Sequence, residues 1–126
     1  MSALALATDW TPSRPAATAG LSPRAAFQEV VALGAVLLDV RPAAVRAREG
    51  EVASWLPVWV AAPGRLHEAA AGLRSSARVV VLASDDDAAA GAIEQLRRAG
   101  VVPCVGVDGG FAAWRSAGMP VEGLAA

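Results

Sequence analysis

Apolar residues along this chain fall into short continuous runs that are separated by amphipathic stretches, a pattern typical of parallel strands alternating with helices. The clearest run, Val79 to Leu82, is mostly β-branched and suits a strand buried on both faces of a sheet. A helix is expected almost at once, because Ile93 and Leu96 share one face and Gly100 supplies a stop. The run from Ala35 to Val40 predicts a second buried strand.

The other predicted elements continue this alternation. Ser22 and Pro23 have the form of a helix cap followed by proline at the first helical position, and Gly34 is expected to end that helix. The remaining expected elements are a short helical turn at 43–49, a strand bracketed by loops within 50–63, a helix at 66–74, a strand at 101–107 interrupted by Pro103, and a helix at 111–117. The sequence therefore predicts an α/β fold with a central parallel sheet of about four or five strands and helices on both faces.

The 126 residues fit one domain with a short segment at each end. Residues 1–20 show no sustained period and are predicted to form an N-terminal arm, which Trp10 would pin to the domain by burying its ring. The domain itself is expected over 21–121, and residues 122–126 form a C-terminal tail. The chain end from Met119 to Ala126 is expected to be short and soft.

Two tryptophans in the segment 50–63 allow two interpretations. Trp55 and Trp59 lie four apart, but Pro57 between them favours an extended path over a helix. We expect at least one of the two rings to be largely buried in the core. The alternative is an exposed aromatic patch that binds a partner.

The net charge and the number of cysteines exclude several classes of function for this chain. The net charge of −1 offers no electrostatic footprint for nucleic acid or an anionic membrane. The first ten residues lack a basic region and are too short, before Asp9, to span a bilayer. A single cysteine excludes an internal disulfide and fits a reducing compartment. We therefore expect a cytoplasmic protein.

The turn between the central strand and its helix, Ala83 to Asp87, is where a ligand site is expected in an open α/β sheet. It contains no nucleophile better than Ser84 and no cation. Carboxylates at a helix start are favoured by the helix dipole, and Ser84 or any of the aspartates is a suitable cap. A metal site is the less favoured interpretation, because three adjacent aspartates cannot all converge on one ion.

Two further residues have side chains that could react or bind a metal, but their positions have simpler explanations. Cys104 lies inside a predicted strand, where a free cysteine is more often a small packed hydrophobe than a reactive thiol. His67 has no second ligand at helical spacing and is expected at the surface.

Several segments resemble, in order and spacing, a rhodanese domain. The resemblance covers Leu21 to Val121, and its strand-Asp-Val-Arg opening and its Gly-Gly-Phe ending are specific in combination. The segment RPAAVRAREGEV is similar to a bacterial rhodanese-like subgroup. The segments that carry the resemblance are LLDVRP at 37–42, GEVASW at 50–55, VVVLASDDDAAAGAIEQLRRAG at 79–100 and VDGGFAAWRSAGMPV at 107–121.

The resemblance implies that the sulfur-carrying loop is degenerate. Family rhodaneses carry a persulfide on a cysteine directly after the central strand, where backbone N–H groups, a helix dipole and an arginine hold an anionic sulfur donor. Here Ala83 stands at the position of that cysteine and Ser84 where the arginine often is. Asp85, Asp86 and Asp87 fill the anion cradle with negative charge, and Ala88 completes the loop.

Two other features of the resemblance bear on the site. Cys104 aligns with the next strand and not with the turn, so it cannot replace the missing cysteine without a large rearrangement. The family's Pro-Gly-Ala after the third motif is altered to Ala53-Ser54-Trp55, which is expected to change a wall of the pocket.

The sequence thus favours a catalytically inactive rhodanese-like domain that acts as a protein-binding, scaffolding or regulatory module. The alternatives are sulfur transfer through Cys104, or a different reaction that uses the acidic residues. We expect no catalytic residue, metal or cofactor, an unidentified protein partner, and no binding to nucleic acid or membranes; a homodimer stays open. The candidate ligand or partner pocket comprises Asp39, Arg41, Trp55, Ser84, Asp85, Asp86 and Asp87.

Overall fold

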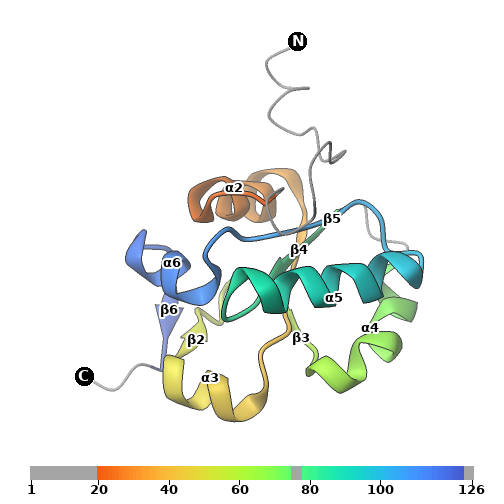
Figure 1. The fold of residues 1–126 in the computed structure, drawn as a ribbon. Coiled ribbons are helices and arrows are strands. Elements are labelled where there is room, and N and C mark those ends of the chain that lie inside the picture. Colours follow the sequence, from red (N-terminus) through yellow and green to blue (C-terminus); the bar gives the residue numbers. More distant parts are fainter. Residues whose placement is uncertain (1–19, 75–77, 124–126) are drawn as a thin grey trace.

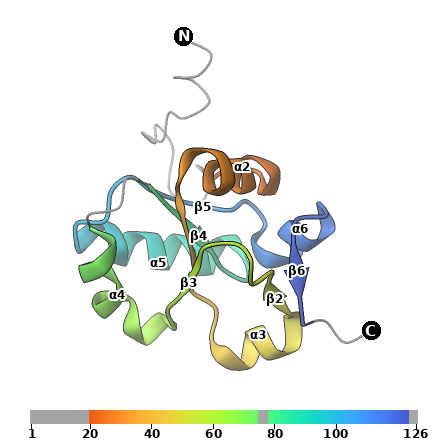
Figure 2. The same cartoon turned by 180° about the vertical axis from the view of Figure 1, so that it is seen from behind.

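The computed structural model describes residues 20–74 and 78–123. Figure 1 shows a central sheet with helices on both of its faces, and Figure 2 shows the same arrangement from behind. The elements in chain order are α2 (Pro23–Leu33), β1 (Val36–Asp39), α3 (Ala43–Glu49), β2 (Glu51–Val52), β3 (Val58–Val60), the 3-10 helix η2 (Pro63–Arg65), α4 (Leu66–Leu73), β4 (Val79–Leu82), α5 (Asp86–Arg98), β5 (Cys104–Gly106), α6 (Gly110–Ser116) and β6 (Val121–Glu122).

The main sheet has four parallel strands in the order β3-β1-β4-β5. Every residue of β4 is buried, because this strand has a neighbour on each side and helices above and below. One core lies under α4 and α5 and contains Leu38 and Val81; the other lies under α2 and α6 and contains Leu37 and Val80. The predicted α/β fold, with about four or five parallel strands covered on both faces, is confirmed.

The ends of α2 lie where the capping residues in the sequence predicted them. The Ser22 hydroxyl accepts a hydrogen bond from the Ala25 N–H at 3.1 Å, and Pro23 occupies the first turn of α2. Gly34 follows that helix in the left-handed conformation with φ 76°. In the described residues, no helix combines the length and apolar character needed to span a bilayer.

The expectation that Trp55 or Trp59 is largely buried is wrong. The two residues are 65% and 44% exposed. Trp59 lies on β3, an edge strand of the sheet, so one side of its ring stays open to solvent while the other contacts Gly72 of α4. Trp55 lies in a turn before β3, and its ring meets that of Phe27 edge-on. Both rings lie at the surface of the domain because the segment that carries them lies at its periphery.

The strand β6 was not predicted, because the segment from Met119 onward was expected to be a soft tail. Val121 and Glu122 form β6, which pairs antiparallel with β2 in a separate two-stranded sheet. Met119 is buried, and the Trp114 indole N–H donates to the Pro120 carbonyl at 3.0 Å. Strands of two residues are too short to show an alternating pattern, so the periodicity of the chain could not predict β2 or β6.

Pro103 marks the start of β5, which lies at the other edge of the main sheet. Cys104 is the first residue of this strand and is 1% exposed, so its interpretation as a packed small hydrophobe is confirmed.

His67 is exposed, as expected. Trp10 and nearly all of the expected arm at 1–20 lie outside the described residues, as do residues 124–126 of the expected tail.

A buried ion pair joins the carboxyl end of β1 to two helices. The Arg41 Nη2 and Nε donate to Asp39 Oδ2 and Oδ1 at 2.8 and 3.0 Å, and both side chains are almost fully buried. Arg41 Nη1 also donates to Glu49 of α3 at 3.2 Å, and its guanidinium carbon lies 3.9 Å from the ring centroid of Phe111 in α6. Burial alone would lower the pKa of Arg41, but hydrogen bonds and attraction from both carboxylates raise it above its usual value.

Burial of Cys104 predicts a slow thiol. Burial raises the pKa of this thiol to about 12, which outweighs the opposing effect of Arg97. We expect a thiol reagent such as Ellman's reagent at pH 8 to react slowly with the native protein and quickly after denaturation in guanidinium chloride. Equal rates in the two states would contradict the buried placement of Cys104.

The buried ion pair predicts a large stability difference between two charge-removing variants. Asp39→Asn leaves the buried guanidinium short of one charge partner, and we expect it to lower the free energy of unfolding by about 3 kcal/mol. Glu68→Gln breaks the exposed Arg65–Glu68 pair and should change it by less than about 1 kcal/mol. Urea denaturation measures both, and equal losses would show that the Asp39–Arg41 pair does not hold the fold together.

Candidate functional site

The turn that follows β4 brings three carboxylates to the start of α5; we call Asp85, Asp86 and Asp87 the acidic turn. Asp85 is the N-cap, and its Oδ1 accepts from the Ala88 N–H at 2.8 Å. The Asp86 Oδ1 accepts from the Gly109 N–H, also at 2.8 Å. Asp87 makes no hydrogen bond or ion pair with any residue that the structure describes. The three aspartates therefore differ in role, although the sequence makes them look equivalent.

The start of α6 packs against the turn after β4 and holds its backbone in place. The Phe111 N–H donates to the Ala83 carbonyl at 2.8 Å. Gly110 has φ 68°, and a Cβ on it would lie 2.6 Å from the Ala83 oxygen and 2.5 Å from the Ser84 oxygen. Only glycine fits this close approach, which explains the second glycine of the Asp-Gly-Gly turn.

The polar groups next to the turn already have protein partners. The Ser84 hydroxyl donates to Glu49 Oε1 at 3.4 Å, the same oxygen that accepts from Arg41 at 3.2 Å. Because Arg41 also binds both oxygens of Asp39, its guanidinium is committed to protein carboxylates. An incoming anion would have to break this buried network to use Arg41.

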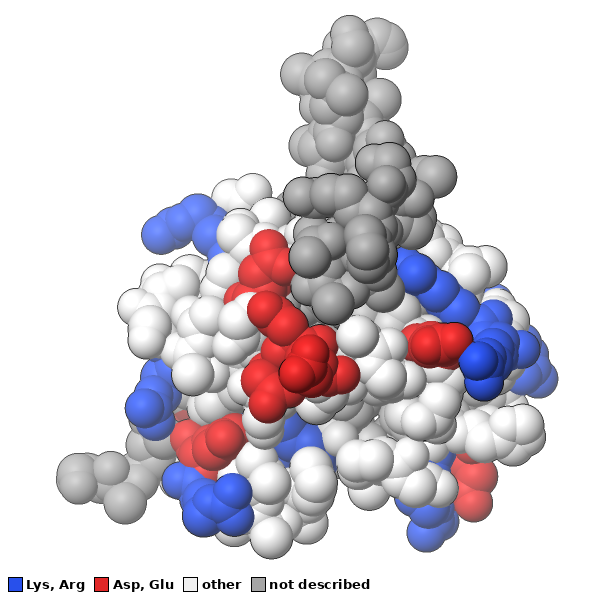
Figure 3. Space-filling model, in the orientation of Figure 1, with Lys and Arg blue, Asp and Glu red and all other residues white. Residues whose placement is uncertain are grey.

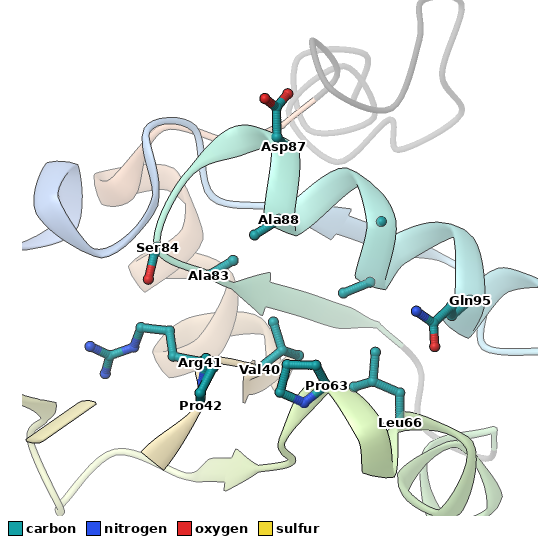
Figure 4. A pocket seen from close by; sticks show the side chains of 12 residues that line it. Val40, Arg41, Pro42, Pro63, Leu66, Ala83, Ser84, Asp87, Ala88 and Gln95 are labelled. Atoms are coloured by element: carbon teal, nitrogen blue, oxygen red, sulfur yellow. The ribbon is translucent and has the colours of Figure 1, made fainter. Parts of the chain in front are cut away.

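A cavity of about 290 Å³ lies beside the turn, at the carboxyl ends of β1 and β4 (Figure 4). In Figure 4 the Arg41 guanidinium points away from Pro63 and Leu66, and the Asp87 carboxylate points away from the cavity. The walls come from the loop after β1, the turn after β4, and the helices η2, α4 and α5. The lining residues are Val40, Arg41, Pro42, Pro63, Leu66, Ala83, Ser84, Asp87, Ala88, Gly91, Ala92 and Gln95.

The structure brings together some of the candidate pocket residues and separates others. Arg41, Ser84 and Asp87 line the cavity. Asp39 is buried behind Arg41 and borders a different depression, next to β2 and β3. Trp55 does not line the cavity; its ring centroid lies 6.3 Å from that of Phe27 in α2.

Asp85 and Asp86 do not line the cavity either, because their carboxylates bind backbone N–H groups beside it. Figure 3 shows acidic side chains gathered in the middle of one face, where the exposed Asp85, Asp86, Asp87 and Asp108 lie at the start of α5 and in the loop before α6. The acidic turn therefore forms a surface outside the cavity mouth.

Sequence reasoning missed the apolar wall that η2, α4 and α5 supply, which includes Pro63, Leu66 and Gly91. Only one of these residues carries a signal in the sequence. Gly91 interrupts a helical pattern where alanine would be favoured by about 1 kcal/mol, and such a glycine usually has a packing or functional reason.

Among the residues that the structure describes, neither a thiol nor a metal-ligand set lies near the turn. In the described part of the chain, no group of three or more histidine, cysteine, aspartate or glutamate side chains is placed to hold a metal ion. Cys104 pairs with Val79 at the first residue of β4, whereas Ala83 follows the last. At about 3.3 Å per residue, the length of β4 separates the two by roughly 13 Å.

No protein-family model matches this chain, and no curated protein sequence matches it. The rhodanese-like domain of the Alr3790 protein from Anabaena matches with a TM-score of 0.68 and 23% identity, over 88% of this chain and 80% of that one. A rhodanese-related protein from Thermoplasma volcanium matches with a TM-score of 0.68 and 22% identity, over 82% and 97%.

The thiosulfate sulfurtransferase from Pseudomonas aeruginosa matches with a TM-score of 0.69 and 22% identity. The match covers 82% of this chain but only 19% of that protein. Identities of this size establish the fold and leave the activity open. Together with the motifs in the sequence, the three likenesses show that this chain has a rhodanese-like fold.

Proposed function

We propose that this chain is a catalytically inactive rhodanese-like domain that acts as a protein-binding module with a scaffolding or regulatory role. The observation that carries the proposal is Ala83 at the end of the central strand, in the place where the family resemblance puts the sulfur-carrying cysteine. The turn that follows offers only Ser84 as a weak nucleophile, and the Ser84 hydroxyl donates to Glu49. Without a thiol here, a persulfide cannot form at this turn.

The electrostatics of the turn also oppose an anionic sulfur donor. The N-terminus of α5 would attract an anion, but the Asp85 carboxylate already accepts from the Ala88 N–H there. Asp86 and Asp87 add further negative charge, and Arg41 is occupied by Asp39 and Glu49. Thiosulfate would therefore meet repulsion at the position where a sulfurtransferase needs attraction.

Sulfur transfer through Cys104 is the second candidate function, because this is the chain's only thiol and a sulfurtransferase shares the fold. Its burial and its raised pKa of about 12 leave little reactive thiolate at neutral pH. Its place at the first residue of β5 also separates it from the cavity. These features favour the binding role.

The acidic turn is the surface that we assign to the partner. Its three exposed carboxylates lie on one side of the domain, so they attract a basic partner and speed its association. This role fits a domain in the cytoplasm, where the single cysteine stays reduced.

The proposal predicts no sulfur transfer from thiosulfate to cyanide above a heat-denatured control. Thiocyanate formation, followed by its coloured iron complex, measures the activity directly. Turnover that disappears in a Cys104→Ser variant would contradict the proposal and establish the second candidate function.

Restoring the cysteine tests separately the two features that oppose catalysis at the turn, the missing thiol and the three carboxylates. We expect Ala83→Cys alone to stay inactive, because a thiolate beside three carboxylates has a raised pKa and still repels the donor. Substantial activity from that single change would show that the missing cysteine is the only obstacle.

Neutralising the acidic turn should remove binding to a basic probe with little loss of stability. The triple variant Asp85→Asn, Asp86→Asn and Asp87→Asn keeps the side-chain acceptors, so the free energy of unfolding should fall by only about 1 kcal/mol. Salt-dependent binding of a hexa-arginine peptide, measured by calorimetry, should be lost.

A matched control removes three exposed carboxylates elsewhere, through Glu68→Gln, Glu94→Gln and Glu122→Gln. Both triple variants change the net charge equally, so only the position of the charge differs. Equal weakening in the two variants would show that the net charge, and not the acidic turn, attracts the peptide.

A further inference from the structure

We propose that two copies of this chain associate through the outer edge of β3, in an antiparallel pairing that places Val60 opposite Val60 of the second copy. β3 is the outermost strand of the order β3-β1-β4-β5, and no other described strand pairs with its outer side. Leu21 extends the sheet at the opposite edge, beyond β5. This surface is separate from the acidic turn, so the inference does not rest on the proposed function.

The outer side of β3 presents backbone groups that another strand can bind. The Ala61 N–H donates inward to the Asp39 carbonyl of β1 at 3.0 Å, so the backbone groups of Val58, Val60 and Ala62 point outward. Among the described residues, the Val60 and Ala62 N–H groups and the Val58 and Val60 carbonyls have no hydrogen-bond partner. A row of such groups is a template for a further strand.

The two outward groups that are already bonded indicate which strand fits. The Val58 N–H donates to the Leu56 carbonyl at 2.9 Å, and the Ala62 carbonyl accepts from the Arg65 N–H at 2.8 Å. With Val60 opposite Val60, Val58 lies opposite Ala62 of the second copy, so these two bonded groups face each other. The unbonded groups then form four hydrogen bonds, two between the Val60 residues and two from the Ala62 N–H groups to the Val58 carbonyls.

This match is a property of the chain paired with itself. A strand from an unrelated protein would place one carbonyl against the bonded Val58 N–H and one N–H against the bonded Ala62 carbonyl. Two-fold pairing centred on Val58 or on Ala62 would need these bonded groups for its central hydrogen bonds. Pairing centred on Val60 is therefore the register in which every outward group between 58 and 62 has a partner.

Two prolines limit the length of this pairing. Pro57 and Pro63 lack an N–H and bracket residues 58–62. In the register centred on Val60 they lie opposite each other, beyond the last hydrogen bonds. The ladder therefore ends at the same place in both copies, and the pairing uses up the free edge of each.

The side chains along this edge favour association of identical copies. Trp59 is 44% and Val60 is 51% exposed, and no residue from 52 to 64 carries a charge. Charged side chains are a common means by which edge strands avoid pairing, and this edge has none. The net charge of −1 adds little repulsion between two copies.

The size of the surface predicts a weak dimer. With about 250 Å² for a whole tryptophan, the exposed part of Trp59 offers roughly 110 Å². Such a short strand in each copy buries less in total than the roughly 1,200 Å² at which stable interfaces begin. We therefore expect a dissociation constant on the order of 100 μM, typical of a transient association.

Two measurements on the unmodified chain test the dimer and its position. Sedimentation velocity between about 10 μM and about 1 mM should show a monomer converting into a dimer. Over the same range, hydrogen exchange of the Val60 and Ala62 amides, followed by NMR, should slow as the concentration rises, because these N–H groups become bonded only in the dimer.

Charge variants at the two-fold axis locate the contact. Val60→Lys places two lysines opposite each other and should weaken the dimer about tenfold or more, and Val60→Glu should do the same. An equimolar mixture of the two variants should regain most of the association, which variants that fail to fold could not do. Val102→Lys adds the same charge at another exposed valine, before β5, and should leave the dimer unchanged.

A proline variant removes the central donors without adding charge. Val60→Pro deletes the outward N–H of both copies, whereas the β3–β1 ladder keeps the inward N–H groups of Trp59 and Ala61. We expect this variant to stay monomeric up to about 1 mM.

Three results would overturn the inference. The first is an unmodified chain that stays monomeric at the highest concentration. The second is a dimer that persists in both Val60→Lys and Val60→Pro, because the contact must then lie elsewhere. The third is protection of the Val60 and Ala62 amides at every concentration, which would show that the edge is covered within one copy by another part of the chain, such as residues 1–19.

Discussion

The buried pairing of Arg41 with Asp39 and Glu49 is the interaction on which the site depends. It joins the end of β1 to α3, packs the guanidinium against Phe111 of α6, and through Glu49 reaches the Ser84 hydroxyl of the turn after β4. Removing these charges from water is costly, and only the near-complete satisfaction of the guanidinium makes their burial tolerable. The same satisfaction withdraws the arginine from any ligand. A cation that lies at the site therefore stabilises the fold and contributes no attraction for an anion.

The turn after β4 shows how one position can keep its geometry while its chemistry changes. Gly110 allows the chain before α6 to approach the carbonyls of Ala83 and Ser84, and the Phe111 N–H holds the first of them. Asp85 then caps α5 with its side chain. Nothing in this backbone arrangement requires a thiol, so alanine fits it without strain. The fold and the sulfur chemistry are therefore separable, as expected when function resides in side chains that a fold carries.

The sequence predicted those features that local patterns encode. Continuous apolar runs located β1 and β4, and Ser22, Pro23 and Gly34 located the ends of α2. The two-residue strands β2 and β6 went unpredicted because their pairing is a tertiary contact with no period. Trp55 and Trp59 were misjudged because hydrophobicity does not reveal which strand lies at an edge. The wall that contains Pro63, Leu66 and Gly91 was not predicted, because three separate segments meet there only in the folded chain.

The site separates charge from apolar surface, and this separation favours recognition over catalysis. Rhodanese-type sulfur transfer needs a nucleophile, a cation and an anionic donor within bonding distance of one another, all inside one pocket. Here the Asp87 carboxylate faces outward and makes no hydrogen bond or ion pair with the described residues, while the cavity beside it is lined mainly by apolar side chains. Charge outside a pocket acts at long range and influences how fast a molecule arrives, whereas an apolar cavity selects by size and shape after arrival. These two functions require no bond to be made or broken, and both remain available to a domain whose central turn carries alanine.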